Sequence, residues 1–169
     1  MSCGRRSVVV GVAFVLIIAA ALHAQTRGDA PEGYRSTYLV IGGQPVSCTS
    51  AGLPVIWVAS HYLNDVGMTI PAGQWTLIRY NPAALNLMSD RIKLFWLGHE
   101  CGHAYLRTSD ETRADCWSAT TGVRQGWFDE DDADDLTVEM QNNPGDLTHP
   151  PGPARVANVR QCIARASRR

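Results

Sequence analysis

The segment His99-Glu100-Cys101-Gly102-His103 constrains this chain more than any other feature. Two histidines four residues apart lie on one face of an α-helix, so both imidazoles can reach a single metal ion. The preceding turn, Leu94 to Leu97, is strongly apolar and places this helix in the core. Glu100 leans toward the same site, where it can take a proton from a metal-bound water. We therefore expect a metal site on a buried helix.

A third ligand is expected from the acidic residues that follow. A catalytic zinc site uses three protein ligands and leaves a fourth position for water. Glu111 would open a second helix opposite the first, and Asp115, one turn later, could accept a hydrogen bond from a ligand histidine. Thr108 to Glu111 also matches a capping box, in which Glu111 would bond only backbone and Asp115 would be the ligand. The residues alone leave both assignments open.

The rest of the chain changes from strand patterns to helix patterns. Strands are expected at residues 38–41, 54–58 and 75–80, with a strand end and a turn at 68–73. Helices are expected at about 90–106, 111–124, 129–140 and 153–166. This order predicts an α+β fold, with a short N-terminal β-sheet followed by a helical half that carries the metal site. The strand at 75–80 is expected to be a sheet edge that an extended peptide can join.

Residues 1–24 have the layout of a secretory signal peptide. Arg5 and Arg6 precede an uncharged apolar run over residues 8–22, and Ala24 offers a small residue for cleavage. The run is short for a membrane-spanning helix, which favours a cleaved signal over an uncleaved anchor. Residues 25–169 then form a single domain that begins with a loose polar arm. We expect an exported protein, periplasmic or secreted, without membrane association after cleavage.

Composition excludes several classes of protein. A chain of 169 residues with a formal net charge of −1 lacks the broad basic surface of a nucleic-acid-binding protein. An apolar content of 45% is too high for a disordered chain. The six acids of Asp129 to Asp135 lack the spacing of a calcium loop and indicate a solvated helix start. The five tryptophans are expected in the core.

Four cysteines remain after signal removal, which in an exported chain suggests two disulfides. Cys101 lies about 200° around its helix from His99, so it points away from the metal. Cys116 lies about 140° around the next helix from Glu111 and also points away. Because the two helices leave a shared turn, we expect a Cys101–Cys116 bridge between them. Cys48 then pairs with Cys162.

Three segments, taken in order, resemble the gluzincin metallopeptidases related to HtpX and the CAAX prenyl proteases, and especially their small soluble minigluzincin relatives. They are His99-Glu100-x-x-His103, Glu111-x-x-Ala114-Asp115, and Thr148-His149-Pro150 followed by Arg155. The similarity covers about residues 80–165. The chain departs from the larger relatives because their membrane helices are absent and only eight residues separate His103 from Glu111.

The resemblance implies a zincin-like domain with one zinc ion per chain, held by His99, His103 and Glu111. Asp115 would support a ligand histidine, and Glu100 would be the general base in the hydrolysis of a peptide or protein substrate. His149 either packs against the helices or closes over the metal as an oxyanion donor or a fourth ligand. The expected function is an exported zinc metallopeptidase. The alternatives are a zinc hydrolase for other substrates and a catalytically silent, zinc-stabilised binding or assembly protein of the cell envelope.

Overall fold

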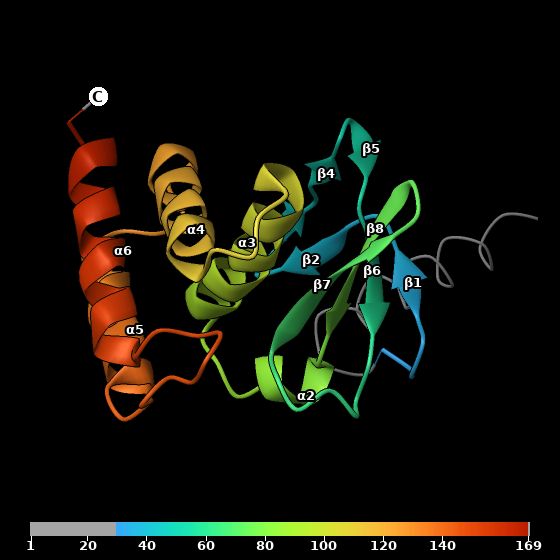
Figure 1. Ribbon diagram of the computed structural model, residues 1–169, viewed down its shortest axis with the longest axis horizontal. Coiled ribbons are helices and arrows are strands. Elements are labelled where there is room, and N and C mark those ends of the chain that lie inside the picture. Colours follow the sequence, from blue (N-terminus) through green and yellow to red (C-terminus); the bar gives the residue numbers. More distant parts are fainter. Residues whose placement is uncertain (1–29, 169) are drawn as a thin grey trace, which may run out of the picture.

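The computed structural model describes residues 30–168, which have a strand-rich N-terminal half and a helical C-terminal half (Figure 1). The predicted α+β class is therefore confirmed. The predicted signal at residues 1–24 lies outside the described residues. Within the described part of the chain, none of the helices combines the length and the apolar character that crossing a membrane requires.

The N-terminal half contains one four-stranded sheet and two small hairpins. The sheet order is β1 (Arg35–Ser36), β6 (Ile56–Ala59), β8 (Trp75–Tyr80) and β7 (Gly67–Ala72). The hairpins are β2 (Leu39–Ile41) with β3 (Gln44–Val46), and β4 (Thr49–Ser50) with β5 (Leu53–Pro54). β8 runs parallel to β6 and antiparallel to β7. The expected loose arm thus ends early, because β1 already belongs to the sheet.

The prediction that residues 75–80 form a sheet edge is wrong. β8 lies between β6 and β7, and β7 is the edge strand beside the helical half (Figure 1). The chain reverses at Gly73, whose φ of +64° suits glycine, and this turn pairs β7 with β8 along six residues. Pro71 argues against a strand in the sequence, but an edge strand tolerates proline because one of its sides needs no backbone donor.

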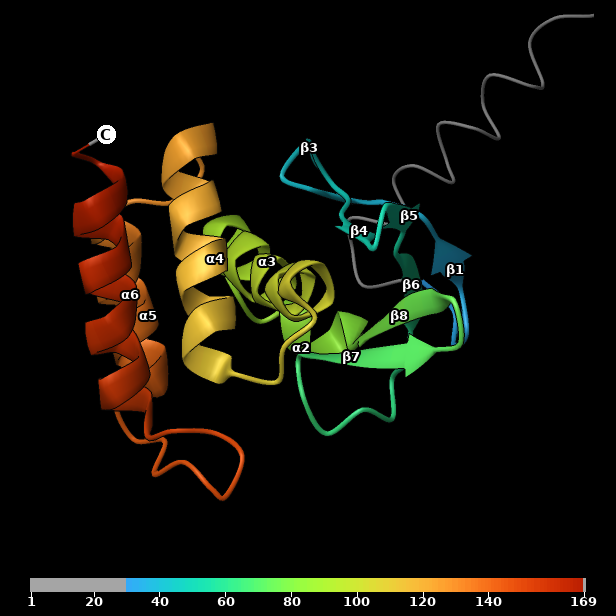
Figure 2. The same cartoon turned by 45° about the horizontal axis from the view of Figure 1, so that its top comes forward.

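The predicted helices are confirmed, with small shifts at their ends. They are α3 (Asp90–Leu106), α4 (Glu111–Gln125), α5 (Glu130–Met140) and α6 (Gly152–Ala166), and a short helix, α2 (Pro82–Leu85), follows β8. Ser89 caps α3 by accepting a hydrogen bond from the Ile92 N–H. Gly126 ends α4 in the left-handed conformation, at a φ of +77°. Figure 2 shows α3 between the sheet and α4, with α4 and α6 side by side.

α3 is the centre of the molecule because it contributes to two hydrophobic cores. Leu94 and Leu97 pack with Trp57 and other residues of the sheet half. Ile92 and Phe95 pack with apolar residues of α4, α5 and α6. The expectation that the turn before the histidine motif is buried is therefore confirmed, since Leu94, Phe95 and Leu97 are all inaccessible or nearly so.

The tryptophans meet the expectation of a core position only in part. Trp57 is fully buried, and Trp117 and Trp127 pack half-buried against the cores. Trp75 is 41% exposed at the start of β8. Trp96 of α3 packs half-buried against the second core and also borders the cleft described below.

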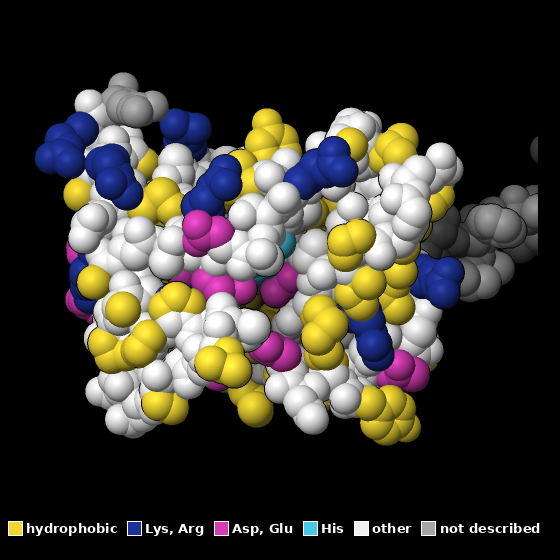
Figure 3. Space-filling model, in the orientation of Figure 1, with side chains coloured by type: hydrophobic (Ala, Val, Ile, Leu, Met, Phe, Trp, Pro, Cys, Tyr) yellow, Lys and Arg dark blue, Asp and Glu magenta, His cyan; other side chains and the backbone are white. Residues whose placement is uncertain are grey.

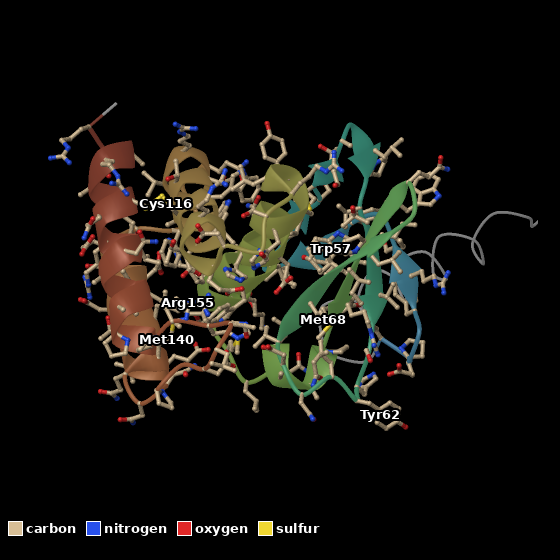
Figure 4. All side chains as sticks on the ribbon, viewed as in Figure 1. Trp57, Tyr62, Met68, Cys116, Met140 and Arg155 are labelled. Carbon is tan, nitrogen blue, oxygen red and sulfur yellow. A yellow bond between two sulfur atoms is a disulfide. The ribbon has the colours of Figure 1, made fainter. Side chains whose placement is uncertain are left out.

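Two disulfides join the four cysteines of the described residues, as expected, but the predicted pairing is wrong. Cys48 is joined to Cys101, and Cys116 is joined to Cys162. The first bridge ties the segment before β4 to α3. The second ties α4 to α6, and Figure 4 shows Cys116 on the side of α4 that faces α6.

The rotation of α3 and α4 about their axes explains this pairing. α3 meets α4 through Gly98 and Gly102, and a Cβ at Gly102 would lie only 2.9 Å from the carbonyl oxygen of Ala114. Cys101 directly precedes Gly102 and is therefore turned about 100° away from this contact. The two cysteines therefore do not face each other, although both lie within about two turns of the shared turn.

Candidate metal centre

Two histidines of α3 and one glutamate of α4 bring three ligand atoms together. His99 Nε2 lies 2.9 Å from His103 Nε2 and 3.2 Å from Glu111 Oε2. His103 Nε2 lies 3.3 Å from Glu111 Oε1. One ligand atom from each residue falls within 4.8 Å of the others, so this group could hold a metal ion. Of the two candidates for the third ligand, the structure places Glu111 in the group.

The contacts of the two Nδ1 atoms show that the converging Nε2 atoms need a cation between them. His99 Nδ1 lies 2.8 Å from Asp115 Oδ1, and His103 Nδ1 lies 2.8 Å from the carbonyl oxygen of Thr108. An ionised carboxylate and a carbonyl only accept hydrogen bonds, so each Nδ1 carries a proton. In a neutral ring, Nε2 then presents a lone pair. Two lone pairs separated by 2.9 Å repel each other unless a proton or a metal ion lies between them.

Asp115 has the supporting position that the sequence analysis gave it. It is 1% exposed, and it accepts hydrogen bonds from Arg155 Nε at 2.8 Å and Arg155 Nη2 at 2.7 Å. Burial alone raises the pKa of Asp115, but the bonds to Arg155 and His99 outweigh it and lower the pKa below its ordinary value. The ionised carboxylate therefore fixes the His99 ring, and Arg155 of α6 fixes the carboxylate.

Glu111 is free to reach the histidines because another residue caps α4. Asp110 is the N-cap and accepts two backbone N–H groups of the first turn, so the alternative of a capping box starting at Thr108 does not form. Glu111 Oε2 is buried, and although His99 Nε2 and Arg155 Nη2 lie 3.2 and 3.4 Å away, neither has the geometry of a hydrogen bond to it. Such an oxygen is uncommon in a folded protein and fits the position of a metal ligand.

Opposite charges dominate the electrostatics of the group. Burial alone raises the pKa of Glu111, but the neighbouring histidines and Arg155 lower it well below its usual range. Burial alone lowers the pKa of His99, but Asp115 and Glu111 raise it to about 9 in the absence of a metal. The metal-free site thus holds a proton in the place that a metal ion would take.

Glu100 lies outside the ligand group and packs against the edge strand β7. Thr69 Oγ1 lies 2.7 Å from Glu100 Oε2 and 3.0 Å from the Glu100 carbonyl oxygen, and donates its proton to this pair of acceptors. Gly67 leaves room for the glutamate, because a Cβ there would lie 2.6 Å from Glu100 Cγ. The side chain is therefore held beside the site by two residues of one strand.

His149 approaches the group from the loop between α5 and α6. Its Nε2 lies 3.8 Å from Glu111 Oε1, and its Nδ1 lies 3.2 Å from both carboxylate oxygens of Asp146. Asp146 also accepts the backbone N–H groups of Thr148 and His149, which shapes the loop. The structure thus places His149 beside the metal group rather than in it.

The group lies in a cleft of about 950 Å³ between β7 and the helical half. Figure 3 shows acidic side chains and a histidine in this hollow.

Several contacts of the site have no signal in the sequence, because they come from a strand, a turn and the end of a distant helix. They involve Thr69, the Thr108 carbonyl, Trp96 and Glu139. Arg155 stands in the third resembling segment, but nothing in that segment indicates its bonds to Asp115.

No family model matches this chain, and no curated protein and no solved structure gives a significant match. The resemblance to the gluzincins therefore depends on the three segments given above and enters the argument below as a proposal.

Proposed function

We propose that this protein is an exported zinc metallopeptidase with a gluzincin-type, zincin-like domain. The observation that carries the proposal is the convergence of His99, His103 and Glu111 on one point, with Glu100 beside them and outside the ligand set. Two histidines and one glutamate are a donor set of catalytic zinc sites. Magnesium and calcium prefer all-oxygen sites, so zinc suits these residues better. Two disulfides fit an oxidising compartment outside the cytosol.

The neighbouring residues fit the hydrolysis of a peptide bond. Zinc, when bound, supplies a Lewis acid that lowers the pKa of water and polarises a carbonyl. Glu100 takes a proton from the attacking water and passes it to the leaving amine. Thr69 holds the Glu100 carboxylate in place through its hydroxyl. Asp115 keeps His99 in the tautomer whose Nε2 can bind a metal.

The free side of β7 suits an extended peptide. The Asn81 N–H donates to the Val66 carbonyl, and alternation along an antiparallel pair then directs the backbone groups of Gly67, Thr69 and Pro71 away from β8. Gly67 and Thr69 can exchange hydrogen bonds with an added strand, whereas Pro71 offers only its carbonyl. Because Gly67 and Thr69 are the residues that hold Glu100, a peptide bound there lies beside the general base.

Two roles fit the position of His149. The Thr148 hydroxyl donates to Asp146 and lies 2.9 Å from His149 Nδ1, and the Asp146 carboxylate lies 3.2 Å from the same nitrogen, so Nδ1 faces acceptors and carries a proton. A doubly protonated ring presents an Nε2–H, which can donate to an oxyanion that develops on the substrate. A neutral ring presents a lone pair at Nε2, which suits a fourth metal ligand and the alternative of a silent zinc-stabilised protein.

Metal analysis paired with a peptide-library assay tests the proposal. Purified mature protein should hold about one zinc ion per chain and cleave peptides. Glu100→Gln should keep the zinc and lose activity by orders of magnitude, because the general base is gone. Glu130→Gln removes the same charge from an exposed position at the start of α5 and is the matched control, with activity retained. A zinc-loaded wild type that cleaves no peptide would contradict the peptidase and favour the silent binding protein.

A further inference from the structure

A second carboxylate lies in the same cleft, on the helical side of the metal group. Trp96 precedes His99 by three residues on α3, and their ring centroids are 5.7 Å apart. The Trp96 Nε1–H donates to Glu139 Oε1 at 3.0 Å. Glu139 is next to the last residue of α5, and Figure 4 shows its neighbour Met140 on the helical side of the cleft, near Arg155. One indole ring therefore separates this carboxylate from a metal ligand.

Glu139 has no cationic partner among the described residues, in contrast to other acids of α5. Glu130 and Asp134 pair with Arg160, and Asp132 pairs with Arg91. Trp96 Nε1 is the one hydrogen-bond donor to Glu139 in the described part of the chain, and it reaches only Oε1. Burial raises the pKa of the Glu139 carboxyl, and the bond from Trp96 offsets this in part. Glu139 is itself an exposed residue that lines the cleft, so its carboxylate is accessible there and has no ion-pair partner in the described part of the chain.

The nearby arginine cannot serve as that counter-charge. Arg155 stacks over Trp96, with its guanidinium carbon 5.3 Å from the ring centroid. Its Nε and Nη2 are bonded to Asp115, and Nη2 also lies 3.4 Å from Glu111 Oε2. The positive charge of Arg155 is therefore matched by the carboxylates of Asp115 and Glu111, and Glu139 Oε2 remains available to the cleft.

We propose that Glu139 is a specificity-determining residue that selects a lysine or arginine side chain next to the scissile bond. The proposal rests on the peptidase function proposed above. The Trp96 ring offers an apolar surface for the aliphatic stem of such a side chain. Glu139 Oε2 offers a charge-assisted hydrogen bond to its cationic end. An acidic side chain in this position would meet the charge of Glu139 and be rejected.

The test compares matched peptides that carry lysine, arginine, norleucine or glutamate on either side of the cleaved bond. Wild type should prefer a basic residue over norleucine at one of these positions by about ten-fold or more in kcat/KM. Glu139→Gln keeps an acceptor for Trp96 and should abolish most of this preference, and Glu139→Lys should favour glutamate instead. Glu130→Gln should behave like wild type. A basic preference that is unchanged in Glu139→Gln, or absent in wild type, overturns the inference.

A binding measurement separates this failure from failure of the peptidase proposal. Zinc-loaded protein is titrated with two peptide hydroxamates that differ only in a lysine or norleucine side chain. Wild type should bind the lysine compound more tightly, and Glu139→Gln should bind both equally. If no peptide is cleaved, the peptidase proposal fails, and the hydroxamates still decide whether Glu139 recognises a basic side chain. If peptides are cleaved and neither assay shows discrimination, the Glu139 inference alone fails.

Discussion

Replacing Asp115 by asparagine tests how a buried carboxylate sets the metal affinity. Asparagine has nearly the same shape, so packing should be retained, but it offers one acceptor oxygen and adds an NH₂ donor. In the native protein, Asp115 accepts from His99 Nδ1 through Oδ1 and from Arg155 through both oxygens. Whichever way the new amide is turned, its NH₂ group meets a donor.

We expect the substitution to weaken metal binding and, separately, to lower the free energy of unfolding. An NH₂ group facing His99 favours the tautomer with a proton on Nε2, which opposes metal binding. Loss of such a supporting contact weakens metal affinity by about 10- to 100-fold, or roughly 1.4 to 2.7 kcal/mol. Arg155 is 4% exposed and loses its main counter-charge. Removing one partner of a buried ion pair costs about 3 kcal/mol of unfolding free energy, reduced here because Glu111 Oε2 still lies 3.4 Å from Arg155 Nη2.

Zinc competition with a chelating dye measures the metal affinity, and urea denaturation of the metal-free protein measures the free energy of unfolding. Asp135→Asn, on the exposed side of α5, is the matched control and should change neither quantity. In the double variant Asp115→Asn with Arg155→Gln, the stranded buried charge is gone, so stability should partly recover while metal affinity stays low. Unchanged zinc affinity in Asp115→Asn would refute the assigned role of Asp115.

Three further predictions address packing, pH and the cross-links. Gly102→Ala should lower the unfolding free energy by about 1 to 3 kcal/mol in urea, because its Cβ meets the backbone carbonyl of Ala114 at 2.9 Å, whereas the open Gly33→Ala should show only backbone strain. The raised pKa of His99, about 9 against an ordinary 6.5, stabilises the metal-free protein below pH 6.5, and this contribution is lost as pH rises to about 9. The loss should reach at most about 3 kcal/mol, should be absent in His99→Gln, and should disappear with zinc bound, which displaces the proton. Replacing either pair of bridged cysteines by serine should cost about 4 kcal/mol in the entropic model, since 53 and 46 residues separate the partners. Equal melting temperatures for the serine variants and wild type would contradict that estimate.

Local signals predicted the elements that position the site. Ser89 marks the start of α3 by its side-chain cap, and Gly126 marks the end of α4 by its left-handed backbone, so these bounds could be predicted without knowledge of the fold. The four-residue spacing of His99 and His103 places both rings on one face of α3, which also follows from the local sequence. These features depend on residues within one or two turns of each other.

Contacts between distant segments could not be predicted in the same way. The cysteine pairing depends on which faces of α3 and α4 meet, and Gly102 sets that choice by permitting close approach to Ala114. Residues 68–73 were expected only as a strand end and a turn, and the full strand β7 depends on its pairing with β8 at a sheet edge, where Pro71 is tolerated. Glu139 gave no signal, since its partner Trp96 lies 43 residues earlier in the chain.

Each of the two disulfides lies within one part of the molecule, and neither joins the two parts. One disulfide closes the unit of sheet and α3, and the other closes the unit of α4 and α6, so neither spans the turn at residues 107–110. Across that turn, Glu111 of the second unit meets His99 and His103 of the first. A metal ion there would add a cross-link between the two units, beside the hydrophobic core that α3 shares with α4, α5 and α6. A chelator would remove this link and leave both disulfides intact, whereas a reductant would open the disulfide within each unit and leave the link between the units.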